Sequence, residues 1–272
     1  MVRRLSAVAA CVSVMLAGSL AHAQSKSNFG DPGEFIFSAD RLLPVLGWSH
    51  ATLTQTNPPM GINKIVTTTN SSSLGFFWGG TPAINDSPGL PGFPTVPVAN
   101  IYTVPRLGFD YTIIPNVTVG GDLIVFFTIG GNVSTESYNN AGGTTTTTNS
   151  APTTTIFGVA PRGGYIFHIN QILSIWARGG FSFYTLTEKQ STTVGTTTTT
   201  YSASYHQPAI DLDPQLVITP LPHFGFTAGL TGDLPFAGGH SYTTNTGGTT
   251  STVSAASSLT FLGVTAGVLG WF

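Results

Sequence analysis

Six histidines are the side chains of this 272-residue sequence with the widest catalytic and metal-binding chemistry. They are His22, His50, His168, His206, His223 and His240. Nucleophilic catalysis needs a serine, a histidine and an orienting acid within hydrogen-bond reach. No histidine stands in a recognisable Ser/His/acid spacing, although strand pairing can bring distant residues together. No two histidines are two or four positions apart, so a metal site is not indicated. We therefore expect no catalytic residues, no metal, no cofactor, and a protein that is not an enzyme.

Charged side chains recur at alternate positions along several segments. In the segment 105–113, Arg106 and Asp110 alternate with Leu107 and Phe109. Alternation with period two is typical of β-strands. The charges that share the polar face are Glu34, Asp40, Arg106, Asp110, Asp122, Arg162, Arg178, Asp211, Asp213 and Asp233.

The composition indicates where the two faces point. Only 7% of the residues are charged, against about 25% in ordinary soluble domains, and the net charge of −2 argues against a nucleic-acid partner. A secreted β-sandwich would show the same alternation, but its surface would carry more charge. We therefore predict an all-β fold, a closed antiparallel transmembrane barrel with apolar residues outward and polar residues inward.

The connections between the predicted strands alternate in length. Short turns are expected at 114–116, 169–171 and 219–222, and long loops at 57–100, 131–152, 188–200 and 235–256. This pattern predicts eight strands, with short periplasmic turns and long extracellular loops. Ten strands remain an alternative if the segment 73–80 joins a break near Pro44. The threonine runs 144–148 and 196–200 are either uncharged filler that extends strands beyond the bilayer or a glycan-bearing or adhesive surface.

The first residues are typical of an export signal. Arg3 and Arg4 precede the apolar or small run 5–20, and Ala21 and Ala23 form a small-x-small cleavage pattern. We predict a signal peptide at 1–23, cleaved after Ala23, and a barrel domain at 24–272. Cys11, the single cysteine, would be removed with it.

The last strand alternates apolar residues up to a terminal phenylalanine. Val264, Ala266, Val268 and Gly270 share a face with Phe272. This ending resembles the assembly signal of bacterial outer-membrane β-barrels, and the chain is similar to the OmpA/OmpX-like superfamily of small barrels, including uncharacterised outer-membrane barrel proteins. The resemblance implies an outer-membrane location, with outer-membrane lipids and the barrel assembly machinery as partners.

An eight-stranded barrel has an interior that side chains can fill. We therefore expect the inward charges to form a network that fills the lumen, and a structural or surface-interaction role with an extracellular ligand bound through the loops. The alternative function is a narrow porin-like channel for small solutes. The third hypothesis is a barrel-borne hydrolase. Aromatic residues are expected at the membrane edges, with lipid-facing or lumenal positions as the alternatives for several of them: Trp48, Trp78, Trp176, Trp271, Tyr102, Tyr111, Tyr165 and Tyr184.

Overall fold

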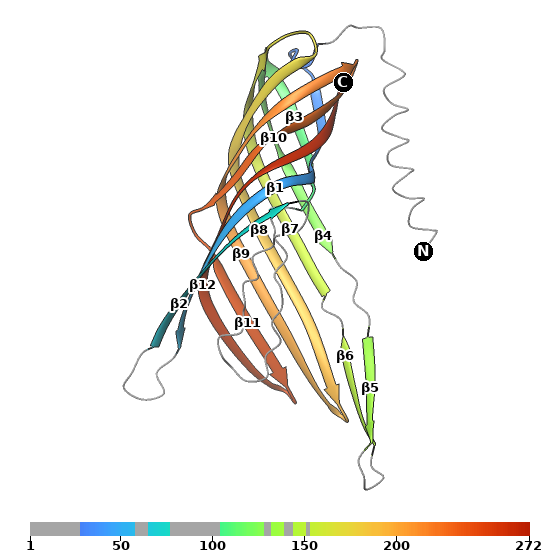
Figure 1. The fold of residues 1–272 in the computed structure, drawn as a ribbon, viewed down its shortest axis with the longest axis vertical. Coiled ribbons are helices and arrows are strands. Elements are labelled where there is room, and N and C mark those ends of the chain that lie inside the picture. The colour runs from blue at the N-terminus through green and yellow to red at the C-terminus, as the bar shows by residue number, and fades with distance from the viewer. Residues whose placement is uncertain (1–27, 58–64, 77–103, 128–131, 139–143, 151–152) are drawn as a thin grey trace.

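The computed structural model describes residues 28–57, 65–76, 104–127, 132–138, 144–150 and 153–272 (Figure 1). The predicted signal peptide, Trp78 and Tyr102 lie outside these residues. Within the described residues, no helix is long and apolar enough to cross a membrane. The strands are β1 (Phe35–Asn57), β2 (Ile65–Phe76), β3 (Arg106–Ile114), β4 (Val117–Phe127), β5 (Asn132–Tyr138), β6 (Thr144–Ser150), β7 (Thr153–His168), β8 (Leu173–Val194), β9 (Thr197–Leu221), β10 (Phe224–Pro235), β11 (Gly239–Thr246) and β12 (Thr249–Trp271).

Eight of these strands close a ring. Each pairs antiparallel with its neighbours in the order β1-β3-β4-β7-β8-β9-β10-β12, and β12 returns to β1. Ile36, for example, pairs with Trp271 on one side and with Asp110 on the other. The prediction of eight strands is therefore confirmed. The segment 73–76 belongs to β2, which pairs with the distal half of β1 instead of adding strands to the ring.

One end of the barrel carries the short turns, and we call it the turn end. Residues 115–116 connect β3 to β4, 169–172 connect β7 to β8, and 222–223 connect β9 to β10. The last turn falls two residues later than predicted, because β9 continues through Thr219, Pro220 and Leu221. The C-terminus lies at the same end (Figure 1). Short turns face the periplasm in barrels of this kind.

At the opposite end, the hairpin end, strands continue far beyond the ring. Three of the long loops predicted from the sequence contain paired strands, namely β5 with β6, β8 with β9, and β11 with β12. The strands form an open sheet in the order β2-β1-β12-β11-β9-β8-β6-β5. In the described part of the chain, β2 pairs only with β1 and β5 only with β6. The strands thus close into a ring toward the turn end and spread into an open sheet toward the hairpin end (Figure 1).

The two faces of the ring strands differ as the alternation predicts. On β3, Leu107 and Phe109 are exposed on the outer face, whereas Arg106, Asp110 and Thr112 are buried inside. Exposed apolar side chains continue around the other ring strands. An outward belt of this kind is what the hydrocarbon of a bilayer requires.

The interior has three layers. We call the layer near the turn end the lower apolar layer, although the turn end is at the top of Figure 1. It contains Phe29, Ile36, Ile166, Trp176, Val217, Leu269 and Trp271. An upper apolar layer toward the hairpin end contains Val104, Ile124, Ile156, Ala160, Tyr184, Leu186, Tyr205, Leu259 and Phe261. The charged residues lie between them, because on β8 and β9 they occupy positions between the residues of the two clusters. The expectation that Trp176, Trp271 and Tyr184 mark the membrane edges is wrong, since all three are buried inside the barrel.

Candidate functional site

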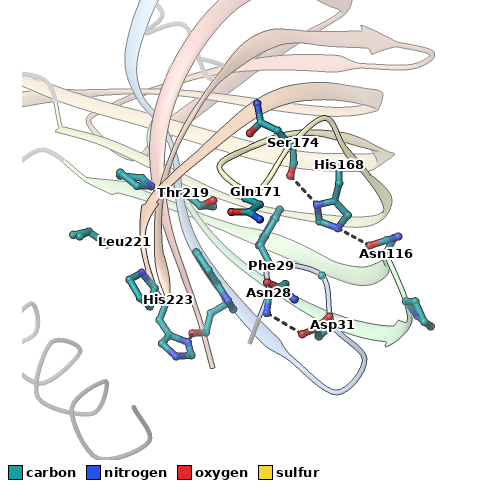
Figure 2. A pocket seen from close by; sticks show the side chains of 16 residues that line it. Asn28, Phe29, Asp31, Asn116, His168, Gln171, Ser174, Thr219, Leu221 and His223 are labelled. Carbon is teal, nitrogen blue, oxygen red and sulfur yellow. Dashed lines mark hydrogen bonds between the residues drawn. The ribbon is translucent and has the colours of Figure 1, made fainter. Parts of the chain in front are cut away.

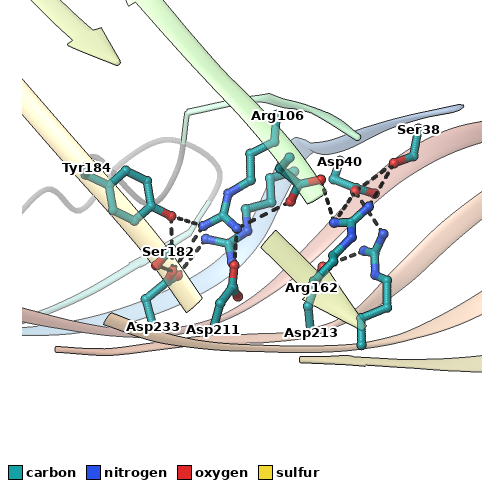
Figure 3. Close-up of polar contacts among 12 residues, drawn as sticks. Ser38, Asp40, Arg106, Arg162, Ser182, Tyr184, Asp211, Asp213 and Asp233 are labelled. Atoms are coloured by element: carbon teal, nitrogen blue, oxygen red, sulfur yellow. Dashed lines mark hydrogen bonds and ion pairs between the residues drawn. The ribbon is translucent and has the colours of Figure 1, made fainter. Parts of the chain in front are cut away.

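The middle layer of the lumen brings together four arginines and six aspartates, and we call it the charge layer (Figure 3). None of the ten residues is more than 6% exposed. They are Asp40, Arg41, Arg106, Asp110, Asp122, Arg162, Arg178, Asp211, Asp213 and Asp233. Nine of the ten charges that the sequence places on the polar face lie here.

The half of the charge layer toward the upper apolar layer is built on Arg41 and Arg106. Arg41 reaches Asp233 at 2.6 Å and Asp211 at 3.1 Å. Arg106 contacts the same two carboxylates and also bonds to the Tyr184 hydroxyl. Two guanidinium groups thus share two carboxylates, and the charge-assisted bonds run from β1 and β3 across the lumen to β9 and β10.

Arg162 is the centre of the other half. Its guanidinium group lies 2.6 Å from both Asp110 and Asp122, and 3.1 Å from Asp40. Asp122 also lies 3.6 Å from Arg106, so this carboxylate joins the two halves. Six ring strands, β1, β3, β4, β7, β9 and β10, therefore meet through ion pairs that are withdrawn from water.

Arg178 completes this half beside the lower apolar layer. It pairs with Asp40 at 2.9 Å and also with Asp213. Its guanidinium carbon lies 4.4 Å from the centre of the Trp176 ring, within the range of a cation–π contact. The charge layer is thus continuous with the aromatic packing beneath it.

Glycine at inward positions makes room for these long side chains. A Cβ at Gly108 would approach Arg162 Nη2 to 2.6 Å and Asp122 Oδ1 to 2.8 Å, and would also meet Ser38. Real Cβ atoms do not come that close, so any larger residue at 108 would displace the ion pairs. This is the physical reason that glycines alternate with charges along the polar face.

Arg41 belongs to the charge layer and was not predicted. Strict alternation would place it outward, because Asp40 points inward. A bulge interrupts the pairing of β1 with β12 between Ala39 and Leu43, and Arg41 has a positive φ of 56°. Asp40 and Arg41, although adjacent in the sequence, therefore both point into the lumen. An arginine facing lipid costs about 2–4 kcal/mol at the bilayer midplane, and that cost was the signal for a break in the alternation.

Glu34 lies apart from the charge layer, next to the turns. Its carboxylate accepts hydrogen bonds from the backbone N–H groups of Gly30 at 2.8 Å and Asp31 at 3.1 Å. It precedes β1 and is outside the membrane-spanning strands. Burial raises the pKa of the Glu34 carboxyl to about 7. The two hydrogen bonds to Glu34 hold residues 28–33 folded back into the mouth of the barrel. Phe29 packs there, with its ring centre 5.6 Å from that of Trp176 and 5.4 Å from that of Trp271.

The predicted assembly signal lies on the outer face of β12. Leu262 and Phe272 are exposed, and Val264, Ala266, Val268 and Gly270 are partly exposed on the same face. The opposite residues of this strand, such as Phe261 and Leu269, fill the lumen.

The chemistry of the charge layer is that of internal ion pairing, in which six carboxyl groups surround four guanidinium groups. Each arginine pairs with at least two carboxylates, so the guanidinium groups are occupied by protein partners. Among the residues that the structure describes, no group of three or more His, Cys, Asp or Glu side chains is arranged to hold a metal ion.

Comparison with known proteins gives low similarities. No family model matches the chain, and no curated protein is significantly similar to it. Among solved structures, the attachment invasion locus protein Ail of Yersinia pestis is 12% identical, with 89% of this chain and 99% of Ail covered and a TM-score of 0.29. The outer-membrane protease OmpT of Escherichia coli is 9% identical, with 92% and 99% covered and a TM-score of 0.36. The assignment of an eight-stranded barrel rests on the strand pairing of this chain itself.

Proposed function

We propose that this chain is a non-conducting outer-membrane barrel whose working part is the open sheet at the hairpin end, acting in adhesion or recognition at the cell surface. The observation that carries the first half is the charge layer between two apolar layers. An ion crossing the lumen would have to break ion pairs and then pass side chains such as Trp176 and Ile156, both 0% exposed. Removing a charge from water without new partners costs several kcal/mol.

The open sheet supports the second half of the proposal. It extends strands beyond the apolar belt, and hydroxyl groups bond across them. Examples are Thr193 to Thr198 at 2.9 Å, Thr246 to Thr199 at 3.0 Å and Ser204 to Ser241 at 2.7 Å. These hydroxyl pairs link neighbouring strands of the sheet and give it a hydroxyl-rich surface. A sheet edge also presents backbone N–H and C=O groups to which an extended polypeptide can add as a further strand. We therefore take an extended protein segment as the partner class.

The sealed lumen is tested by conductance. Refolded barrel is inserted into planar lipid bilayers at about 100 mV, and no discrete current steps above the lipid background are expected. Regular single-channel openings from the folded barrel would contradict the proposal and favour the narrow porin-like channel.

The surface role is tested by shortening one hairpin without touching the ring. Gln190 and Tyr201 face each other across β8 and β9, so residues 191–200 can be replaced by Asn-Gly, a two-residue turn that suits a hairpin. Bacteria displaying the full chain should adhere to host-cell monolayers or to a protein-coated surface, and the shortened variant should adhere less. Heat-modifiable migration on SDS gels confirms that both barrels are folded. Equal adhesion by the two barrels and by cells without either would contradict the surface role.

A further inference from the structure

A cavity of about 1070 Å³ opens at the turn end, on the periplasmic side of the lower apolar layer. Its walls come from all three short turns and from residues 28–31, and they include Asn116, His168, Ser174, His223 and Trp271 (Figure 2). This volume is just above the range of about 300–1,000 Å³ that is usual for small-molecule sites. The cavity is separate from the charge layer, and neither the proposed surface role nor the sealed lumen uses it.

Three side chains in the cavity wall form a hydrogen-bonded chain (Figure 2). The Ser174 hydroxyl lies 3.0 Å from His168 Nδ1, and His168 Nε2 lies 2.8 Å from Asn116 Oδ1. His168 and Ser174 are cross-strand partners in the β7–β8 hairpin. Asn116 comes from the turn between β3 and β4, where its φ of 67° turns it toward the histidine. His168 is 6 residues from Ser174 and 52 residues from Asn116 in the sequence. These separations form no recognisable motif.

The bonding pattern fixes the tautomer of His168. The Asn116 oxygen can only accept, so a neutral imidazole at this position carries its proton on Nε2. Nδ1 is then an unprotonated acceptor directed at the Ser174 hydroxyl. A serine hydroxyl bonded to an unprotonated imidazole that a third group orients is the arrangement that activates a nucleophile.

All three side chains lie along the wall of the cavity. Ser174 is 4% exposed and lines the cavity, while His168 is exposed. Gly30 lies over the other end, where a Cβ would come within 3.2 Å of Asn116 Oδ1 and 3.6 Å of His168 Nε2. Gly30 also has a positive φ of 97°. Glycine at this position therefore keeps the third member of the chain uncrowded.

We propose that Ser174, His168 and Asn116 form an acyl-transfer site that hydrolyses small neutral carboxylic esters entering from the periplasm. Ser174 is the nucleophile, His168 the general base and Asn116 the positioning residue. This differs from the expectation of no catalytic residues, because strand pairing brings together residues that the sequence separates. A neutral asparagine stabilises an imidazolium less than an aspartate does, which favours the better leaving group of an ester over that of an amide. Asp31 in the cavity wall disfavours anionic substrates.

The reaction balances without a further reagent except water. The Ser174 proton moves to His168 Nδ1 as Oγ bonds to the ester carbonyl carbon. The bond from that carbon to the alkoxy oxygen then breaks, and the leaving alcohol takes the proton from Nδ1. Water attacks the acyl-serine, giving its proton to His168, and the departing Oγ recovers that proton as the carboxylic acid is released.

The test is covalent labelling of the folded barrel in detergent with an uncharged fluorophosphonate, with the modified residue located by mass spectrometry. We expect modification of Ser174 in the folded form, which keeps its fast migration on unheated gels, and none after boiling. General-base catalysis contributes about 10²–10⁴-fold, so His168→Gln should lower the labelling rate at least 100-fold. Ser251→Ala, an exposed serine at the hairpin end, is the matched control and should label like the parent chain.

Asn116 is tested by two variants that both tolerate a positive φ. Asn116→Gly removes the acceptor and should lower the labelling rate, whereas Asn116→Asp supplies a carboxylate acceptor and should restore it. The proposal is overturned if folded parent barrel is not modified at Ser174. It is also overturned if His168→Gln labels as fast as the parent, since Ser174 would then react without its base.

Discussion

Replacing Arg162 with methionine should destabilise the barrel more than any exposed substitution of the same kind. The side chain faces Asp40, Asp110 and Asp122 within 3.1 Å, and it is 6% exposed. Methionine keeps most of the volume and removes the charge, so the loss arises from three carboxylates left without this partner. Removing one member of a buried ion pair costs about 3–5 kcal/mol. With three partners affected, we expect a loss of about 4–5 kcal/mol in the free energy of unfolding.

The assay is urea unfolding of the refolded barrel in lipid vesicles, followed by tryptophan fluorescence and by heat-modifiable migration. Lys189→Met is the matched control, because Lys189 is exposed at the hairpin end and its replacement should change stability by less than about 0.5 kcal/mol. A double variant, Arg162→Met with Asp110→Asn, should recover about 1–2 kcal/mol, since it removes one of the stranded charges. Losses within 1 kcal/mol of each other for Arg162→Met and Lys189→Met would refute the reasoning that the charge layer holds the strands together.

Three further outcomes are expected. Gly108→Val should also weaken the barrel in the urea assay, because its side chain would occupy the space of the ion pairs, and a neutral effect would contradict the packing described for Gly108. Phe29→Ala should release residues 28–33 from the mouth of the barrel at a local cost of about 3 kcal/mol, measured as faster proteolysis near the N-terminus, with the ring intact. We call residues 28–33 docked when they are folded into the mouth of the barrel. The pKa of Glu34 is raised to about 7 in the docked form, so this form holds a proton that the undocked form loses above about pH 4.5. Docking should therefore be firmest below that pH and weaken as the pH rises to about 7, whereas Glu34→Gln should show no such trend in the same proteolysis assay.

The layering of the interior explains why a polar lumen need not conduct. Charges on the inner face are compatible both with a pore and with a sealed barrel. The decisive feature is what lies above and below them along the barrel axis. Ile166 and Trp176 on one side, and Ile156 and Leu259 on the other, fill the lumen with apolar side chains. Polar groups among those layers, such as Gln207 beside Leu259 and the Trp176 indole N–H, are bonded to protein partners.

Much of the fold could be predicted from the sequence by itself. Period-two alternation is a local property, so Arg106 and Asp110 could be placed on one face and Leu107 and Phe109 on the other without any structure. The low charge content then placed the apolar face toward lipid, and the alternation of short and long connections determined the count of eight strands. The separation of polar and apolar faces is repeated on every ring strand, and this repetition made the barrel evident.

Only the tertiary structure decided which residues meet. The partner of each arginine depends on the stagger between strands in the closed ring, and Arg162 and Asp40 are 122 residues apart. The bulge that turns Arg41 inward breaks the local rule and is compensated by Asp211 and Asp233 on the far side of the lumen. Likewise, the proximity of Ser174, His168 and Asn116 arises from two hairpins brought side by side. Alternation along one strand determines the face of a residue, whereas its neighbours are determined by ring closure, which is a property of all the strands together.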